Sequence, residues 1–228
     1  MQIRNFIVAG LVLALSSSAA IAADMSSPKA TLKGFAQAIK SGDKAAAKTF
    51  VVDEPKEQEA ADLALSFILP VLELDNTMQA KYGQGLSSEA GGFDQDAFSD
   101  ELIDKAEVEV DGDSALVTNE EGSETELTKV DGNWKITMAG QMPPEEQMDM
   151  AKRVSSAMGT AANNIAEGVK SGQYATADEA SNAFQFQMQQ VMQQIMMEEM
   201  QRQMQQQGEG GMQGGGMQGG GMGEDDGQ

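Results

Sequence analysis

Methionine recurs at helical spacing toward the C-terminal end of the 228-residue chain. The repeat comprises Met188, Met192, Met196, Met200 and Met204, with Met197 beside it. Side chains four residues apart lie one turn apart on a helix, and thioether sulfur is a soft ligand that suits Cu(I). The candidate metal ligands are therefore Met192, Met196, Met197, Met200 and Met204. The alternative is an adaptable apolar surface that packs on another helix or on another chain.

The chain contains no histidine and no cysteine, which removes several kinds of site. Imidazole titrates near neutral pH, and thiolate is both a nucleophile and a zinc ligand. Without them a Ser-His-Asp triad, a Cys-His pair, a His/Cys zinc site and a disulfide are all excluded. We expect no bound cofactor, and acid–base chemistry is left to carboxylates.

Four carboxylates lie beside apolar positions in the sequence, namely Asp75, Asp94, Asp104 and Glu107. A carboxylate that an apolar pocket desolvates can act as a general base. Most carboxylates are solvated surface groups, however, so the composition favours a protein without a catalytic residue.

Clustered carboxylates between residues 94 and 101 raise the question of calcium binding. An EF-hand loop that began at Asp94 would need an oxygen ligand at its fifth position, glycine at its sixth and glutamate at its twelfth. The chain has Phe98, Ser99 and Lys105 there, so the match fails. An acidic helix start is the better interpretation, because carboxylates are favoured in a first helical turn.

The net charge is strongly negative, with 36 acidic and 15 basic residues and a formal charge of −21. Such a chain repels polyanions, so nucleic acid is not an expected partner. Anionic membrane surfaces are disfavoured for the same reason.

The first 23 residues have the three parts of a secretory signal peptide. Arg4 supplies a positive charge, residues 6–15 are apolar, and Ala20, Ala22 and Ala23 provide small residues for cleavage. The apolar run is too short to span a bilayer, which takes roughly 20 residues. We expect cleavage after Ala22 or Ala23, a periplasmic or extracellular location, and no membrane attachment afterwards.

The segment from residue 24 to 105 predicts helices. Ser27 and Pro28 can cap and begin the first of them, and Gly42 can end it. A short helix follows over 44–51, and Pro55 opens a longer one that Pro70 should kink or divide. Residues 94–105 predict a further short helix.

The pattern then changes from helical to alternating, which is typical of strands. The expected strands are residues 106–110, 115–118, 125–130 and 134–138. Asp111-Gly112 and Asp131-Gly132 favour tight turns between neighbouring strands. The prediction is an α+β domain over residues 24–140, in which N-terminal helices pack on a four-stranded or larger antiparallel sheet.

Two more helices are expected after the sheet, over residues 145–171 and 177–206. Thr176 and Glu179 have the spacing of a capping box at the start of the second helix. The short turn between them predicts an antiparallel hairpin over residues 141–207. Residues 208–228 are rich in glycine and methionine, end in acidic residues and predict a disordered tail.

Two motifs resemble a known superfamily. The capped helix SPKATLKGFAQAIKSGD and the hairpin LTKVDGNWKI resemble the SnoaL-like, or nuclear-transport-factor-2-like, fold, in particular its small exported bacterial members of unknown function. The resemblance covers residues 26–140. It implies opening helices laid across a strongly curved sheet, with a pocket that takes a small ligand. Some members are dehydratases or isomerases that rely on His and Asp, whereas others bind ligands or dimerise.

Together these features favour an exported, non-enzymatic binding or assembly module. Residues 177–206 are the expected surface for a protein partner or for a second copy, and the sheet pocket is the expected place for a small ligand. Two alternatives stay open. One is a periplasmic protein that binds Cu(I) through methionine, and the other is a small pocket enzyme that uses one carboxylate as acid or base.

Overall fold

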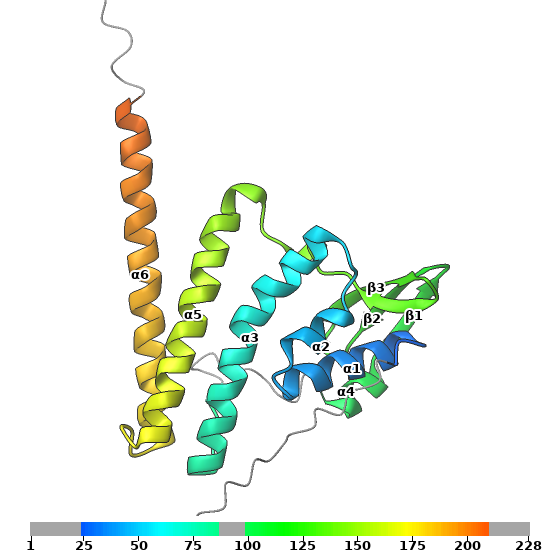
Figure 1. Ribbon diagram of the computed structural model, residues 1–228, viewed down its shortest axis with the longest axis horizontal. Helices are drawn as coiled ribbons and strands as arrows, with labels where there is room; N and C mark the ends of the chain where they lie inside the picture. The colour runs from blue at the N-terminus through cyan, green and yellow to red at the C-terminus, as the bar shows by residue number, and fades with distance from the viewer. Residues whose placement is uncertain (1–23, 87–98, 210–228) are drawn as a thin grey trace, which may run out of the picture. The chain divides into compact units, whose positions relative to one another are not determined.

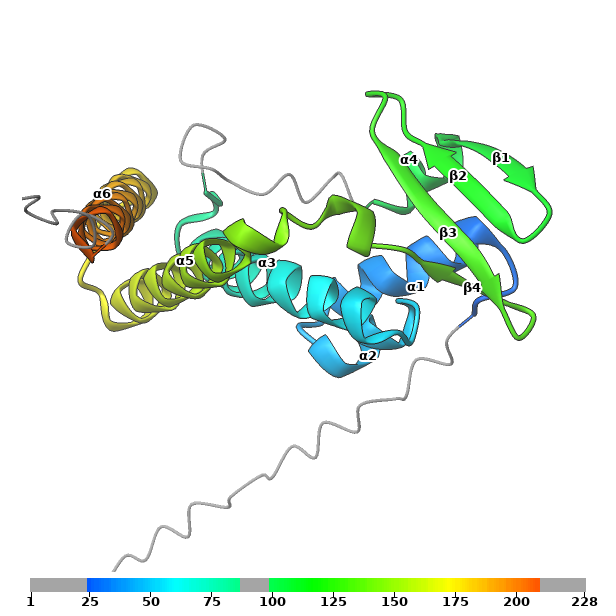
Figure 2. The same ribbon diagram turned by 90° about the horizontal axis from the view of Figure 1, so that it is seen from above.

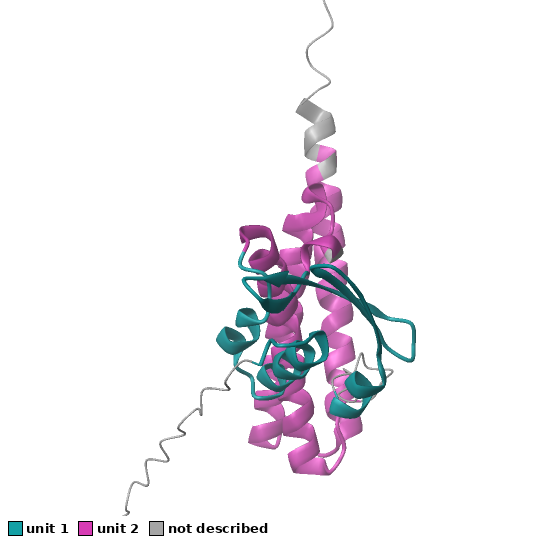
Figure 3. Ribbon diagram, turned by 90° about the vertical axis from the view of Figure 1, so that its right-hand side faces the viewer, with its two compact units in different colours: residues 1–53, 98–137 teal, residues 54–97, 138–228 magenta. Residues whose placement is uncertain are grey.

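The computed structural model describes residues 24–86 and 99–209 of the chain. The predicted signal peptide at 1–23, the carboxylate Asp94 and the tail from residue 210 onward lie outside the described residues. The described part is mixed α+β, with six α-helices and one open four-stranded antiparallel sheet (Figure 1). It divides into two compact units (Figure 3). Unit 1 comprises residues 1–53 and 98–137, and unit 2 comprises residues 54–97 and 138–228.

The sheet of unit 1 contains the four predicted strands in the order β1-β2-β3-β4. They are β1 (Glu107–Asp111), β2 (Ser114–Thr118), β3 (Glu124–Val130) and β4 (Asn133–Ile136). The register pairs Val108 with Val117 and Leu127 with Ile136. The β3–β4 turn has positive φ at both Asp131 and Gly132, which a two-residue hairpin of the favoured twist requires.

Three helices complete unit 1: α1 (Pro28–Lys40), α2 (Lys44–Thr49) and α4 (Asp100–Lys105). The Ser27 hydroxyl accepts a hydrogen bond from the Ala30 amide, so the predicted cap begins α1. Helix α1 packs against β2 and β4. Buried side chains of the unit include Phe35, Ile39, Phe50, Val51, Ile103, Leu127, Trp134 and Ile136. The core of unit 1 is therefore formed by α1, α2, α4 and one face of the sheet.

The two edges of the sheet differ. Along β4, the Ile136 amide donates to the Phe50 carbonyl at 2.8 Å, and the Trp134 amide donates to the Met25 carbonyl at 2.9 Å. Backbone from the start of unit 1 thus satisfies this edge. Strand β1 forms the other edge and is largely exposed, with Val110 at 56%.

Unit 2 consists of α3 (Pro55–Tyr82), α5 (Glu145–Ser171) and α6 (Ala177–Glu209), preceded at α5 by a short 3₁₀-helix over Ala139–Gln141. Helix α5 lies between α3 and α6 (Figure 2). The division differs from the predicted domains 24–140 and 141–207, because α3 shares a compact unit with the C-terminal helices. The reason is that α5 buries residues against both neighbours, including Ser155 and Gly159 against α3.

Helix α3 continues through Pro70, so Pro70 does not divide it, which was one of the two outcomes that the sequence predicted. Proline has no amide hydrogen, so it cannot bond the carbonyl four residues back, which is that of Ser66. Gly159 of α5 packs directly at this point, where an added Cβ would lie 2.6 Å from the Ser66 oxygen. The Ser66 and Ser155 hydroxyls share a hydrogen bond of 2.6 Å beside it. The two helices therefore approach closely at Gly159, Ser155 and Ser66, which are all small residues.

Candidate functional site

The N-terminal part of α6 is anchored in a core. The predicted cap is present, because the Glu179 amide donates to the Thr176 hydroxyl. The Glu179 carboxylate accepts from the amide of Ala175, one residue before the cap. Ala177, Ala180 and Phe184 then enter a buried cluster with side chains of α3 and α5. The members from those helices are Val71, Leu74, Met78, Ala161, Ala162, Ile165, Ala166 and Val169. The start of α6 is thus fixed in position and rotation.

The C-terminal part of α6 is held to α5 by charge and by one apolar residue. Nη1 of Arg153 donates to Glu198 at 3.1 Å, and Nη2 donates to Glu199 at 3.3 Å. Ile195 is buried, with 6% of its surface exposed. Because Ile195, Glu198 and Glu199 recur at helical spacing, one side of α6 is turned toward α5 along this stretch.

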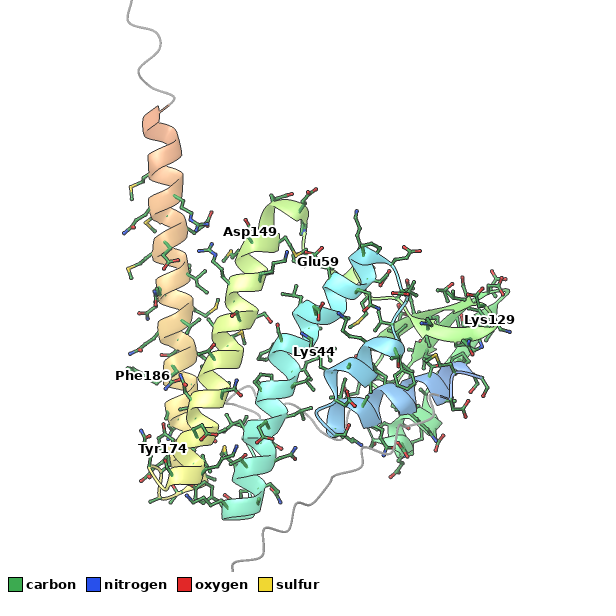
Figure 4. The ribbon with its side chains drawn as sticks, in the orientation of Figure 1. Lys44, Glu59, Lys129, Asp149, Tyr174 and Phe186 are labelled. Carbon is green, nitrogen blue, oxygen red and sulfur yellow. The ribbon has the colours of Figure 1, made fainter. Side chains whose placement is uncertain are left out.

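The opposite side of α6 is an exposed apolar surface. We call Phe186, Met196, Met197, Met200 and Met204 the outer face. Each of these side chains is 60–62% exposed. Figure 4 shows Phe186 on the side of α6 that points away from α5. The predicted methionine stripe therefore divides, because Met188 packs against the buried cluster whereas the outer-face methionines do not.

Of the five predicted metal ligands, the structure brings three together within one helical turn. Met200 is a helical neighbour of both Met196 and Met197, at separations of four and three residues, and Met196 and Met197 are adjacent in the chain. Met192 is 39% exposed and lies one turn before this group, and Met204 lies one turn after it. Among the residues that the structure describes, no group of three or more Asp and Glu side chains could hold a metal ion.

An apolar groove runs between α3 and α5. It has a volume of about 430 Å³, and its lining is Leu63, Ala64, Phe67, Pro143, Gln147, Met150, Ala151, Val154, Ser155 and Met158. The Ser155 hydroxyl is already hydrogen-bonded to Ser66 and to the Leu63 carbonyl. The groove therefore offers apolar contact with one free polar group at most, the Gln147 amide, within its lining.

A charged hollow of about 580 Å³ is lined by residues from the N-terminal parts of α3 and α5. Figure 4 labels two of these residues, Glu59 and Asp149. Lys152 forms an ion pair with Glu59 at 2.5 Å. The hydrogen bond to Glu59 raises the pKa of Lys152 above its usual value. The pairing with Glu59 therefore favours the charged form of Lys152.

Two of the four carboxylates singled out in the sequence, Asp75 and Asp104, have structural contacts. Asp75 is buried and accepts the Leu86 amide at 2.6 Å, and Asp104 pairs with Lys33 at 2.7 Å. Glu107 is exposed on the edge strand β1. A buried carboxylate that the sequence did not reveal is Glu57, which accepts the amides of Met138 and Ala139. Its partners lie more than 80 residues away, so no local pattern signals this contact.

The small-ligand pocket implied by the resemblance would lie on the sheet. The sheet residues Ala115, Val117, Leu127, Trp134 and Ile136 are buried. The Thr31 hydroxyl of α1 donates to the Trp134 carbonyl at 3.1 Å, so α1 lies directly on this face. The groove and the charged hollow described above belong to unit 2.

Among the described helices, none combines the length and the apolar character that crossing a bilayer requires. Comparison of the chain with protein-family models, with curated proteins and with solved structures finds no match. The outer face of α6 and its surroundings are therefore the basis on which a function can be assigned.

Proposed function

We propose that this protein is an exported, non-enzymatic assembly module in which the outer face of α6 binds the outer face of a second copy. The observation that carries the proposal is the exposure of one phenylalanine and four methionines on one side of a helix. The four methionines lie close together on the helix, whereas exposed Gln189, Gln190 and Gln193 separate Phe186 from them. An exposed cluster of apolar side chains of this kind marks an interaction site. Methionine suits such a surface because its flexible thioether adapts to the shape of a partner.

Charge favours a second copy as the occupant. The chain carries a net charge of −21, so two copies repel one another over most of their surface. Residues 180–197 of α6 contain no charged side chain. This segment is therefore where two equally acidic chains can approach, and it offers no carboxylate to attract a basic partner.

The carboxylates that follow this segment are directed toward their own chain. Glu198 and Glu199 both bind Arg153 of α5, which reduces their repulsion of a second α6. An isologous pair, in which each copy contributes the same face, is the commonest arrangement of two identical chains. Burying each outer-face side chain contributes roughly 1.5–3 kcal/mol before the entropy of association is subtracted.

The test is the mass in solution of the chain and of two matched variants. Sedimentation velocity of the mature protein is expected to show a species larger than the monomer. M196Q/M200Q/M204Q replaces thioethers with the side chain already common on α6 and is expected to be monomeric. M196L/M200L/M204L keeps the apolar surface and is expected to keep the larger mass. A monomeric wild-type protein at high concentration, or an unchanged mass for the glutamine variant, would contradict the proposal.

Export is proposed from the pattern of residues 1–23. Expression of the full chain in a bacterium with a secretion pathway should give a mature protein that begins at Ala23 or Asp24. Mass spectrometry of the N-terminal peptide checks this. A protein that retains residues 1–22 would contradict export.

In unit 1 we propose a scaffold of the SnoaL-like type. Three helices, α1, α2 and α4, and a four-stranded antiparallel meander with Asn133-Trp134 after the last tight turn support that relationship. The buried aromatic residues between α1 and the sheet favour a scaffold over a ligand-binding pocket. An experimental structure with an open cavity against β2 and β3 would overturn this part.

A further inference from the structure

We infer that Met196, Met197 and Met200 bind one Cu(I) ion through their three thioether sulfurs. All three side chains are 60–62% exposed, so packing within the chain does not use them. Cu(I) is a soft ion that prefers sulfur to the oxygen ligands of calcium or magnesium sites. The chain contains no thiolate and no imidazole that would compete for the ion.

The spacing makes this triplet different from the rest of the stripe. Positions that are three or four residues apart on a helix have Cβ atoms about 5–6 Å apart. In the triplet all three pairs lie within one turn, so the long, flexible side chains can direct three sulfurs at one point. Met192 and Met204 are each within one turn of only part of the triplet. They can form pairs with it but cannot complete a second compact triangle.

The backbone that carries the triplet is fixed from the other side. Ile195 is buried, and Glu198 and Glu199 are bound by Arg153. These residues alternate with the triplet along α6, so the turn is already formed before the ion arrives. Holding Glu198 and Glu199 at Arg153 also keeps hard oxygen ligands away from the sulfur site, while the acidic chain still attracts a cation.

Copper binding and self-association both involve Met196 and Met200, but copper binding depends on their sulfur atoms and self-association depends on their apolar surface. Self-association needs apolar surface, which leucine supplies about as well as methionine. Copper binding needs sulfur, which leucine lacks. M196L/M197L/M200L therefore separates the two proposals, because it is expected to lose the ion and keep the mass.

The experiment is an anaerobic titration of the mature full-length protein with Cu(I) in the presence of a colorimetric chelator that competes for the ion. Wild-type protein is expected to withdraw one Cu(I) per chain. M196L/M197L/M200L is expected to bind at least tenfold more weakly. M150L/M158L, which makes the same chemical change on α5, is expected to bind like wild type. Circular dichroism checks that the helices of each variant are intact.

A second measurement follows the ligand atoms directly. In protein with ¹³C-labelled methionine methyl groups, Ag(I) serves as a surrogate for Cu(I) that does not change oxidation state. The methyl signals of Met196, Met197 and Met200 are expected to shift together and to saturate at one equivalent.

Three outcomes would overturn the inference: no withdrawal of Cu(I) by wild type, equal affinity in the leucine triplet variant, or shifts confined to other methionines. Each leaves self-association intact if sedimentation still shows the larger species. Conversely, a monomeric protein that binds one Cu(I) at the triplet overturns only the assembly proposal.

Discussion

The two ends of unit 2 differ in whether their apolar side chains are buried or exposed. At the end that contains Phe184, which we call the closed end, three helices surround a buried cluster. At the end that contains Arg153, which we call the open end, ion pairs hold the helices beside an apolar groove and exposed methionines. The comparison shows that most of the buried contacts of α6 lie at its closed end, whereas its exposed methionines lie at the open end. The closed end fixes α6, and the open end leaves one of its faces free.

The largest expected effect separates two phenylalanines of α6 that lie two residues apart. Phe184 is 1% exposed and Phe186 is 61% exposed. Phe184→Ala is expected to lower the free energy of unfolding by about 3–5 kcal/mol because it leaves a cavity in the closed end. Phe186→Ala is expected to change it by less than about 0.5 kcal/mol. Urea denaturation at low protein concentration measures both, and similar losses would break the comparison.

The contact of α3 with α5 lies between the two ends and is the next test. Gly159→Ala would place a Cβ 2.6 Å from the Ser66 carbonyl oxygen, so the helices must separate. The expected loss is about 1–3 kcal/mol in the free energy of unfolding. Gly140→Ala is the matched control, since nothing lies within 4 Å of the Cβ it would add. A control that costs as much as Gly159→Ala would show that the close approach is not the cause.

At the open end, Arg153→Met removes the charge but keeps an unbranched apolar chain. Arg153 is 27% exposed, so the expected loss of stability is about 1 kcal/mol at most, and it should shrink in high salt. Amide hydrogen exchange should speed up around Ile195 to Arg202 because the clamp on α6 is gone. Lys170→Met removes an ion pair at the closed end, where the core holds the helices, and is expected to leave exchange in α6 unchanged. Equal amide exchange rates of α6 in the Arg153→Met and Lys170→Met variants would show that the ion pairs of the open end do not hold α6 in place.

The smallest expected effect is that of the ion pair between Glu59 and Lys152. The hydrogen bond to Glu59 raises the pKa of Lys152 above its unfolded value of about 10.5. A raised lysine pKa contributes stability that is fully present below the unfolded value and is lost as the pH rises through the folded value. Glu59→Gln should therefore lower the urea midpoint slightly near pH 8 and match wild type at pH values above the raised pKa. A difference that persists at high pH would have another cause.

Features with local signals were predictable from the sequence. The caps at Ser27 and Thr176 and the four strands depend on residues close together in the chain. The strand boundaries agree with the predicted ones to within two residues.

The grouping of α3 with α5 and α6 depends on contacts that are about 90 residues apart, such as that between Ser66 and Ser155. Helical periodicity shows that each helix has an apolar side, but it does not show which helix covers that side. The candidate site was predictable only as a stripe for the same reason. Met188 and Met196 both belong to the four-residue repeat of methionines, yet Met188 packs against the buried cluster and Met196 is exposed.

The two edges of the sheet in unit 1 determine whether a strand of another chain can add to the sheet. An unpaired strand edge is a template onto which another chain can add a strand, and continued addition leads to fibrils. The β4 edge is occupied by the chain's own backbone near Phe50 and Met25. Within the described residues no strand pairs with the outer side of β1, which carries Glu107, Glu109 and Asp111 in alternation. A second β1 laid alongside would bring carboxylates of like charge together, so the addition of a strand at this edge is opposed.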